Sequence, residues 1–277
     1  MISQIKKNKI GFMQGRMVSC VKNRIQYFPD KDWINELKIA KKNKFKIIEW
    51  SINSENIKKN PFYNGDLEII KKSLKDNNIR CNSVTCDFFM QKPFFKKKFK
   101  FKKNLLISDL LKVIDNAKKL NLMYIIIPLV DQSSIKNKKE EKCLIDNFKK
   151  MILPKLGKLC ILFEIDYKPG DIMNFIKQFK SKKFGINYDT GNSAGLNFDT
   201  KDEFKYFSFV KNIHVKDRKK YGKTVDLGKG NWNFGLFFKK LKKTNYTGNL
   251  ILQTARAKDG NHVKKILENR NFLYKYI

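Results

Sequence analysis

The stretch "FGINYDTGN" fills residues 184–192 and joins an apolar run to a polar turn. The run "FGINYD" predicts a short strand, and "DTGN" consists of residues that are common in turns. Taken alone, the stretch therefore predicts a strand followed by a turn. Whether Asp189 also has a chemical role depends on which residues end the other strands of the chain.

Seven further runs resemble this one, and segments with helical periodicity separate them. The eight predicted strands are 9–14, 45–50, 80–86, 123–128, 160–165, 184–189, 210–215 and 250–255. The clearest amphipathic helices between and after them are 32–43, 66–77, 107–120, 233–244 and 262–276. Short buried strands joined by helical crossovers form a parallel sheet, and eight such units predict a closed (β/α)8 TIM barrel. No linker divides the chain, so residues 1–277 are predicted to form one domain.

The formal net charge of +34 raises the question of a nucleic-acid partner. Of the 60 basic residues six are Arg, which leaves 54 Lys spread over the whole chain. Proteins that read nucleic-acid sequence rely on Arg, whose planar fork binds two acceptors at once. We interpret the charge as a compositional bias on solvated helix faces. We therefore expect no specific nucleic-acid partner, and only weak, salt-sensitive attraction to polyanions.

The compartment is predicted from what the chain lacks. No stretch reaches the ~20 apolar residues of a membrane span, and the N-terminus has no continuous apolar segment typical of a signal peptide. The five cysteines form no CxxC pair, which fits reduced thiols. We expect a cytoplasmic protein without a membrane partner. A homo-oligomer stays open as one alternative for the oligomeric state.

Polar residues end several of the predicted strands, and a TIM barrel places its chemistry at those ends. Four consecutive strands, the fifth to the eighth, contribute Glu164, Asp189, His214 and Gln253. Two carboxylates, an imidazole and an amide oxygen around one point suit Mn²⁺, Mg²⁺ or Zn²⁺. These four residues are therefore predicted to bind one divalent metal ion.

Seven short motifs, taken in order, resemble the xylose isomerase-like TIM-barrel superfamily and, within it, the sugar phosphate isomerase/epimerases. They are "IGFMQGRM" (10–17), "IIEW" (47–50), "LFEID" (162–166), "NYDTGN" (187–192), "IHVKD" (213–217), "LGKGNW" (227–232) and "ILQTARAKDG" (251–260). The resemblance spans nearly the whole chain. It implies an intramolecular isomerase or epimerase that acts on a sugar or sugar phosphate.

The resemblance also implies a division of roles in the site. Family members hold the metal with Glu, Asp, His and a second Glu, and this chain has Gln253 in place of the second Glu. The metal acts as a Lewis acid that stabilises a cis-enediolate, and the two Glu positions, here Glu164 and Gln253, are the catalytic ones. An amide cannot exchange protons, so Glu164 is the expected base.

Three other functions remain as alternatives. One base on one face also suits an elimination, as in the related inosose dehydratases. A non-catalytic sugar-binding barrel is the second alternative, because Gln253 replaces the family Glu. The three-zinc site of endonuclease-IV-like AP endonucleases needs several His, and this chain has only His214 and His262. The composition therefore argues against the third alternative, a nuclease of that kind.

The substrate-binding residues are predicted from their places beside the strand ends. Three of the six Arg lie in these loops, which favours an anionic substrate. The segment "DLGKGNW" (226–232) follows the seventh strand, where barrels often bind phosphate through glycine amides. The long basic segment 87–104 is either a lid or a solvated loop. The predicted substrate-binding set is Gln14, Arg16, Glu49, Lys216, Asp217, Arg218, Gly228, Gly230 and Arg256.

Overall fold

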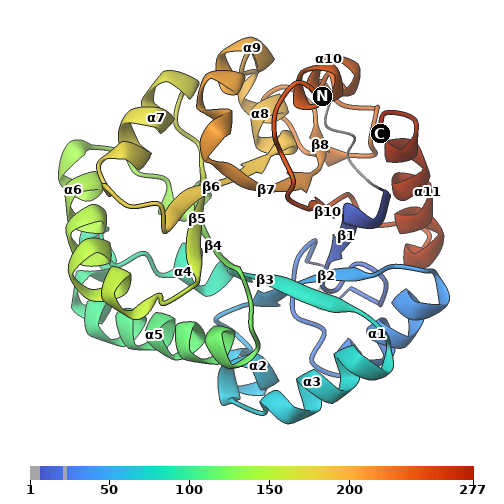
Figure 1. Ribbon diagram of the computed structural model, residues 1–277, viewed down its shortest axis with the longest axis horizontal. Helices are drawn as coiled ribbons and strands as arrows, with labels where there is room; N and C mark the ends of the chain where they lie inside the picture. The colour runs from blue at the N-terminus through green and yellow to red at the C-terminus, as the bar shows by residue number, and fades with distance from the viewer. Residues whose placement is uncertain (1–6, 21–23) are drawn as a thin grey trace.

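A computed structural model describes residues 7–20 and 24–277 and contains a closed barrel of eight parallel strands. Around the ring, the strand order is β1-β10-β7-β6-β5-β4-β3-β2, and a ring of helices surrounds it (Figure 1). The barrel strands are β1 (Ile10–Met13), β2 (Ile47–Ile52), β3 (Arg80–Cys86), β4 (Tyr124–Leu129), β5 (Cys160–Ile165), β6 (Phe184–Asp189), β7 (Val210–Val215) and β10 (Leu250–Leu252). The predicted fold class is confirmed.

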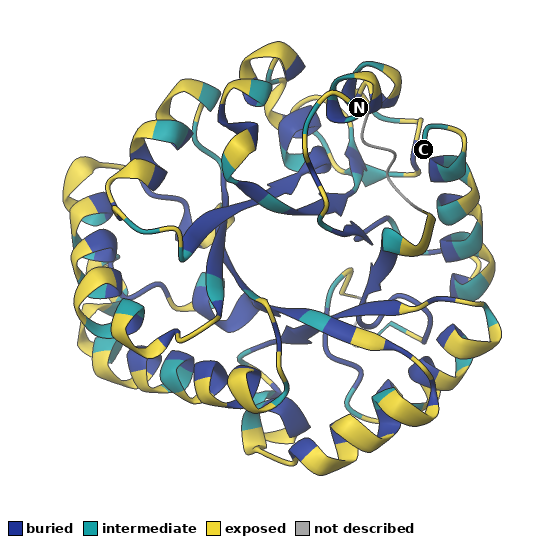
Figure 2. Ribbon diagram, in the orientation of Figure 1, coloured by how far each residue is buried: buried dark blue, intermediate teal, exposed yellow. Residues whose placement is uncertain are grey.

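The helices cover the outside of the barrel, and their outward faces are exposed to solvent (Figure 2). They are α1 (Trp33–Lys42), α2 (Pro61–Asn64), α3 (Leu67–Asp76), α4 (Asp87–Gln91), α5 (Lys103–Lys119), α6 (Lys138–Asn147), α7 (Pro169–Lys177), α8 (Thr190–Leu196), α9 (Thr200–Glu203), α10 (Phe234–Leu241) and α11 (His262–Tyr274). All five clearest predicted helices are present. Within the described residues, no helix is long and apolar enough to cross a membrane.

Aromatic side chains fill the layer between the strands and the helices. The Phe163 ring of β5 stacks on the Phe184 ring of β6 with centroids 6.0 Å apart, and Phe148 and Phe175 also contact Phe163. Offset and edge-on ring pairs of this kind stabilise a core beyond simple burial. The core fixes the strands firmly, so side chains at their carboxyl ends have defined positions.

The inside of the barrel changes from apolar to polar along the strands. Met13, Ile47 and Ile251 form a small separate apolar cluster. Glu49 lies two residues after Ile47 and therefore points to the same side of β2. It contacts His214 of β7, a strand that is not its neighbour, so this side faces the interior. β2 ends at Ile52 rather than at the predicted residue 50, which corrects the prediction that Glu49 ends a strand.

The basic segment 87–104 is folded onto the barrel. Phe89, Phe94 and Phe95 are buried and pack on one another. Lys96 forms an ion pair of 2.6 Å with Glu140 of α6. The start of the segment forms α4, and its later part is the short 3₁₀ helix η3 (Lys97–Lys102), which has an exposed surface. The segment is thus anchored at its start and exposed over its later part, and the role of a lid stays a prediction.

Candidate metal centre

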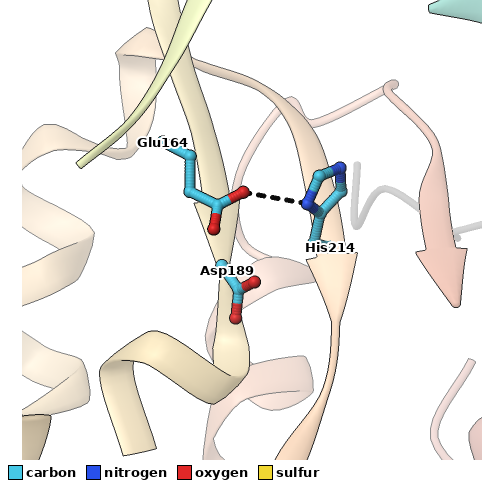
Figure 3. A group of neighbouring side chains, drawn as sticks. All are labelled: Glu164, Asp189 and His214. Carbon is cyan, nitrogen blue, oxygen red and sulfur yellow. Dashed lines mark hydrogen bonds and ion pairs between the residues drawn. The ribbon is translucent and has the colours of Figure 1, made fainter. Parts of the chain in front are cut away.

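Glu164, Asp189 and His214 come together at the carboxyl ends of three neighbouring strands, β5, β6 and β7 (Figure 3). One potential ligand atom from each residue lies within 4.8 Å of the others, and all three residues are buried. Parallel strands place their last residues side by side, which explains why residues 25 or more positions apart converge. The group has the donor types that a divalent metal prefers.

His214 lies between two carboxylates. Its Nδ1 is 3.0 Å from Glu164 Oε2, and its Nε2 is 2.6 Å from Glu49 Oε1. Burial alone would lower the pKa of His214, but the charges and hydrogen bonds of Glu49 and Glu164 outweigh it and raise the pKa to about 10. The imidazole is therefore oriented and made more basic by Glu49, as a ligand histidine often is by a carboxylate behind it.

Glu49 is satisfied entirely by protein groups. Its two oxygens also accept hydrogen bonds from Ser83, Thr85 and Asn212, and it has no exposed surface. The charge and hydrogen bond of His214 lower the pKa of Glu49 in spite of its burial. These contacts give Glu49 a positioning role behind His214, and they do not favour the predicted contact with substrate.

Each residue of "DTGN" contributes to the site. Asp189 caps α8 by accepting from the Asn192 amide at 2.8 Å, and its other oxygen, Oδ2, lies 2.8 Å from Lys216 Nζ. Thr190 Oγ1 accepts from the Lys216 backbone N–H at 2.8 Å. A Cβ on Gly191 would lie 2.7 Å from the Lys216 side chain, so only glycine allows this approach. Asn192 Nδ2 donates to Glu164 Oε1 at 2.8 Å.

Lys216 connects the centre to Gln253. Its Nζ lies 2.8 Å from Asp189 Oδ2 and donates to Gln253 Oε1 at 3.1 Å. The ammonium is thus a cation held by oxygen atoms of two of the four predicted ligands, Asp189 and Gln253. Gln253 Nε2 donates in turn to Gln26 Oε1 at 2.7 Å. The predicted fourth ligand therefore lies on the same side of the barrel mouth as the other three.

The donor set fits a divalent metal ion. Glu164 and Asp189 bring two carboxylates close together, and here the nearby positive charges are His214 and Lys216. A metal would supply the same compensation with more charge at one point. The residues that would hold it are Glu164, Asp189 and His214, and a fourth donor from Gln253 stays a prediction.

A cavity of about 700 Å³ opens beside the centre. Glu164, Lys216 and Gln253 line it, and so do Gln26, Asn53 and Asp87. Four basic side chains also line it, namely Arg24, Lys216, Arg218 and Lys223. Arg218 is held by the Gly222 carbonyl, which accepts from its Nε at 3.1 Å and its Nη2 at 2.9 Å. The cavity has the polar lining and the size of a small-molecule site.

Gln14, Arg16 and Arg256 do not line this cavity. Arg256 donates to the backbone carbonyls of Gly15 and Val18, and Arg16 donates to the Ile25 carbonyl and to Gln26. Burial and the neighbouring Arg256 lower the pKa of Arg16 to about 9. Gln14 is fully buried and accepts from the Ser51 amide at 3.2 Å. These contacts hold the segment after β1 in place, and a contact with substrate stays a prediction.

Asp217 organises the glycine-containing loop 226–232. Its carboxylate accepts hydrogen bonds from the backbone N–H groups of Arg218, Gly228, Gly230 and Trp232 at 2.9–3.2 Å. A Cβ on Gly230 would lie 2.0 Å from Asp217 Oδ1, so this close approach requires glycine. The amides that were predicted to bind an anion are thus bound by Asp217, and anion binding by the loop stays a prediction.

Several cavity residues were not among the predicted ones. Asn192 was part of the quoted motif but received no role, and Asp87 directly follows a predicted strand. The position of Asp87 after a strand was a usable signal, but residues 87–104 were assigned to a loop and the signal was not used. Gln26 carried no signal, because it lies in an irregular segment well beyond β1, whereas Asn53 directly follows β2, whose end was predicted at residue 50.

The comparisons with known proteins agree with this architecture. The chain matches the family described as "Xylose isomerase-like TIM barrel" over residues 37–276, and it belongs to that family. The resemblance predicted from the motifs is confirmed. Among curated proteins, MJ1311 of Methanocaldococcus jannaschii is 27% identical over 104 residues. That match covers 36% of this chain, and the chain spans only 36% of the relative's length.

Two solved structures show how widely the fold is shared. D-Psicose 3-epimerase, solved in the presence of D-fructose, has 15% identity and a TM-score of 0.74, over 97% of this chain and 99% of that one. The IOLI protein, solved with a bound zinc atom, has 14% identity and a TM-score of 0.74 over the same shares. At these identities the likeness establishes the fold alone.

Proposed function

We propose that this protein is a divalent-metal-dependent isomerase or epimerase that acts on a sugar or sugar phosphate, with Glu164 as the base. The observation that carries the proposal is the buried convergence of Glu164, Asp189 and His214 within 4.8 Å beside a cavity of about 700 Å³. Structural neighbours that are sugar 3-epimerases, or that bind zinc or magnesium, support it.

The chemistry follows from the charges around the cavity. When bound, a divalent metal supplies a Lewis acid that stabilises negative charge on the substrate oxygens. Burial opposes the charged form of Glu164, but hydrogen bonding to His214 and the charges of His214 and Lys216 lower its pKa. Glu164 is therefore ionised at neutral pH and can accept a proton from the carbon beside a carbonyl, which gives an enediolate.

Basic side chains favour a substrate with an acidic group. Arg218 and Lys223 line the cavity beyond the centre, and Arg218 is fixed by Gly222 and by the close approach of Gly195. A fixed guanidinium is suited to a phosphate or carboxylate, because its fork binds two oxygens. We expect this end of the cavity to bind the anionic end of a sugar phosphate or acidic sugar.

Metal analysis followed by deuterium exchange tests the proposal. The purified protein is stripped with a chelator, reloaded with Mn²⁺, Mg²⁺ or Zn²⁺, and incubated in D2O with a panel of ketoses and ketose phosphates. We expect about one metal per chain and metal-dependent incorporation of deuterium at a carbon next to the carbonyl. A protein that binds a sugar but neither retains metal nor exchanges would instead be a sugar-binding barrel.

A further inference from the structure

Asp87 lines the cavity that opens beside the metal centre. It is the first residue after β3, which lies two strands from β5, the strand of Glu164, and four strands from β7, the strand of His214, in a ring of eight. The side chains of Asp87 and Glu164 nevertheless line the same cavity. A small molecule bound between them would have Glu164 on one side and Asp87 on the other.

Two neutral amides hold the Asp87 carboxyl group. Gln26 Nε2 donates to its Oδ2 at 2.9 Å, and Asn53 Nδ2 donates to the same oxygen at 3.2 Å. Oδ1 accepts no hydrogen bond from the residues that the structure describes, although Asp87 is only 5% exposed. One oxygen is therefore fixed, and the other is available to a molecule in the cavity.

Gln26, one of the two amides that hold Asp87, is also connected to the metal centre through Gln253. Gln26 accepts from Gln253 Nε2 at 2.7 Å, and Gln253 accepts from Lys216. Gln253 thus spans the gap between the two sides of the cavity mouth instead of offering a second carboxylate. Another carboxyl group that lines the cavity is that of Asp87, the first residue after β3.

The protonation states of the two carboxyl groups differ. Burial raises the pKa of Asp87 to about 7, and the nearby Glu164 carboxylate adds to that shift against the opposing effects of Gln26, His214 and Arg16. Asp87 therefore keeps its proton to a higher pH than Glu164 does. Two carboxyl groups whose environments separate their pKa values in this way are suited to act as acid and base.

We propose that Asp87 is the second acid–base residue of this site and protonates the enediolate on the face opposite Glu164. The inference rests on the proposed function. Glu164 accepts the proton from the substrate carbon, and the electron pair of the broken C–H bond enters the enediolate. Protonated Asp87 then gives its proton to the same carbon from the other face as the carbonyl re-forms. The product is the epimer, and exchange with solvent restores protonated Asp87 and ionised Glu164.

Asp87→Asn separates this role from that of Glu164. The asparagine oxygen can still accept the hydrogen bonds of Gln26 and Asn53, so the site keeps its shape. The metal-loaded variant and wild type are incubated in D2O with the substrate that exchanges. We expect epimer formation to fall at least about 100-fold, as for loss of a general acid. The variant should still replace the substrate's own C–H by deuterium, because Glu164 can remove and return that proton unaided.

The matched control is Asp171→Asn, which changes an exposed aspartate in the first turn of α7 and should leave epimer formation unchanged. If Asp87→Asn does not fold, Asp87→Ser is measured with the same two readouts. Epimer formation by the variant within about threefold of wild type would overturn the inference, and so would a wild type that forms only an aldose from the ketose. That second result would leave the proposed function standing, whereas a metal-loaded wild type without any exchange rejects both.

Discussion

Two carboxyl groups that line the cavity are equally buried, but their pKa values are shifted in opposite directions. Glu164 is 6% exposed and Asp87 is 5% exposed, yet the pKa of Glu164 is lowered and that of Asp87 is raised. Glu164 contacts His214 and lies near Lys216, both cationic, while Asp87 is held by the neutral amides of Gln26 and Asn53. Because both groups are buried, burial does not distinguish them. The charge of the neighbouring side chains decides which of the two is the base.

The largest effect is expected when the carboxylate of Glu164 is replaced by an amide. Glu164→Gln removes the carboxylate that lines the cavity and contacts His214 of the metal centre. Deuterium exchange into the substrate should fall by about 10²–10⁴-fold, the range for loss of a general base. Exchange is measured by mass spectrometry. The control Glu268→Gln, on the exposed face of α11, should exchange like wild type, and full exchange by Glu164→Gln would assign the base elsewhere.

The next effect concerns the support behind His214. Glu49→Gln removes the charge that raises the basicity of the imidazole through Nε2. Metal affinity should fall about 10–100-fold, because residues behind a ligand histidine contribute on that scale. Titration of the stripped protein with Mn²⁺ or Zn²⁺ gives the affinity. An unchanged affinity would mean that His214 is not a ligand or that Glu49 does not orient it.

The arginines near the cavity, like the carboxyl groups, differ in the groups that they contact. Arg256→Met removes both donors to the carbonyls of Gly15 and Val18, and should lower the free energy of unfolding by about 2 kcal/mol. Arg218→Met should instead raise KM for an anionic substrate, because Arg218 lines the cavity. Its effect on the free energy of unfolding should be smaller than that of Arg256→Met. Denaturant titration and kinetics measure the two effects, and the reverse pattern would contradict the comparison.

The smallest effect is a pH dependence of stability. Because the folded pKa of Asp87 is about 7, above the usual value of 3.8, the folded state keeps a proton that the unfolded chain releases. The stability from this group is present at low pH and is lost as pH rises from about 4 to about 7. The free energy of unfolding of Asp87→Asn, taken relative to that of wild type, should therefore rise by on the order of 2 kcal/mol between pH 5 and pH 8. A constant difference over that range would show that the pKa is not raised.

The sequence by itself determined the order of the strands along the chain and, for β5, β6 and β7, the residues at their carboxyl ends. Strands 160–165, 184–189 and 210–215 have the bounds predicted for them, because short apolar runs between polar turns define buried parallel strands locally. Glu164, Asp189 and His214 then converge, since neighbouring parallel strands end at one edge of the barrel.

Tertiary structure alone decided the partner of each polar group. Glu49 meets His214 across 165 positions, and Gln26 meets Asp87 across 61. The amides of Gly228 and Gly230 are bound by Asp217, and the donors of Arg256 by the carbonyls of Gly15 and Val18. Protonation and availability for a ligand depend on contacts near 3 Å between residues far apart in the chain. Local sequence patterns contain no record of such contacts, so only the folded barrel separates a positioning residue from one that faces the cavity.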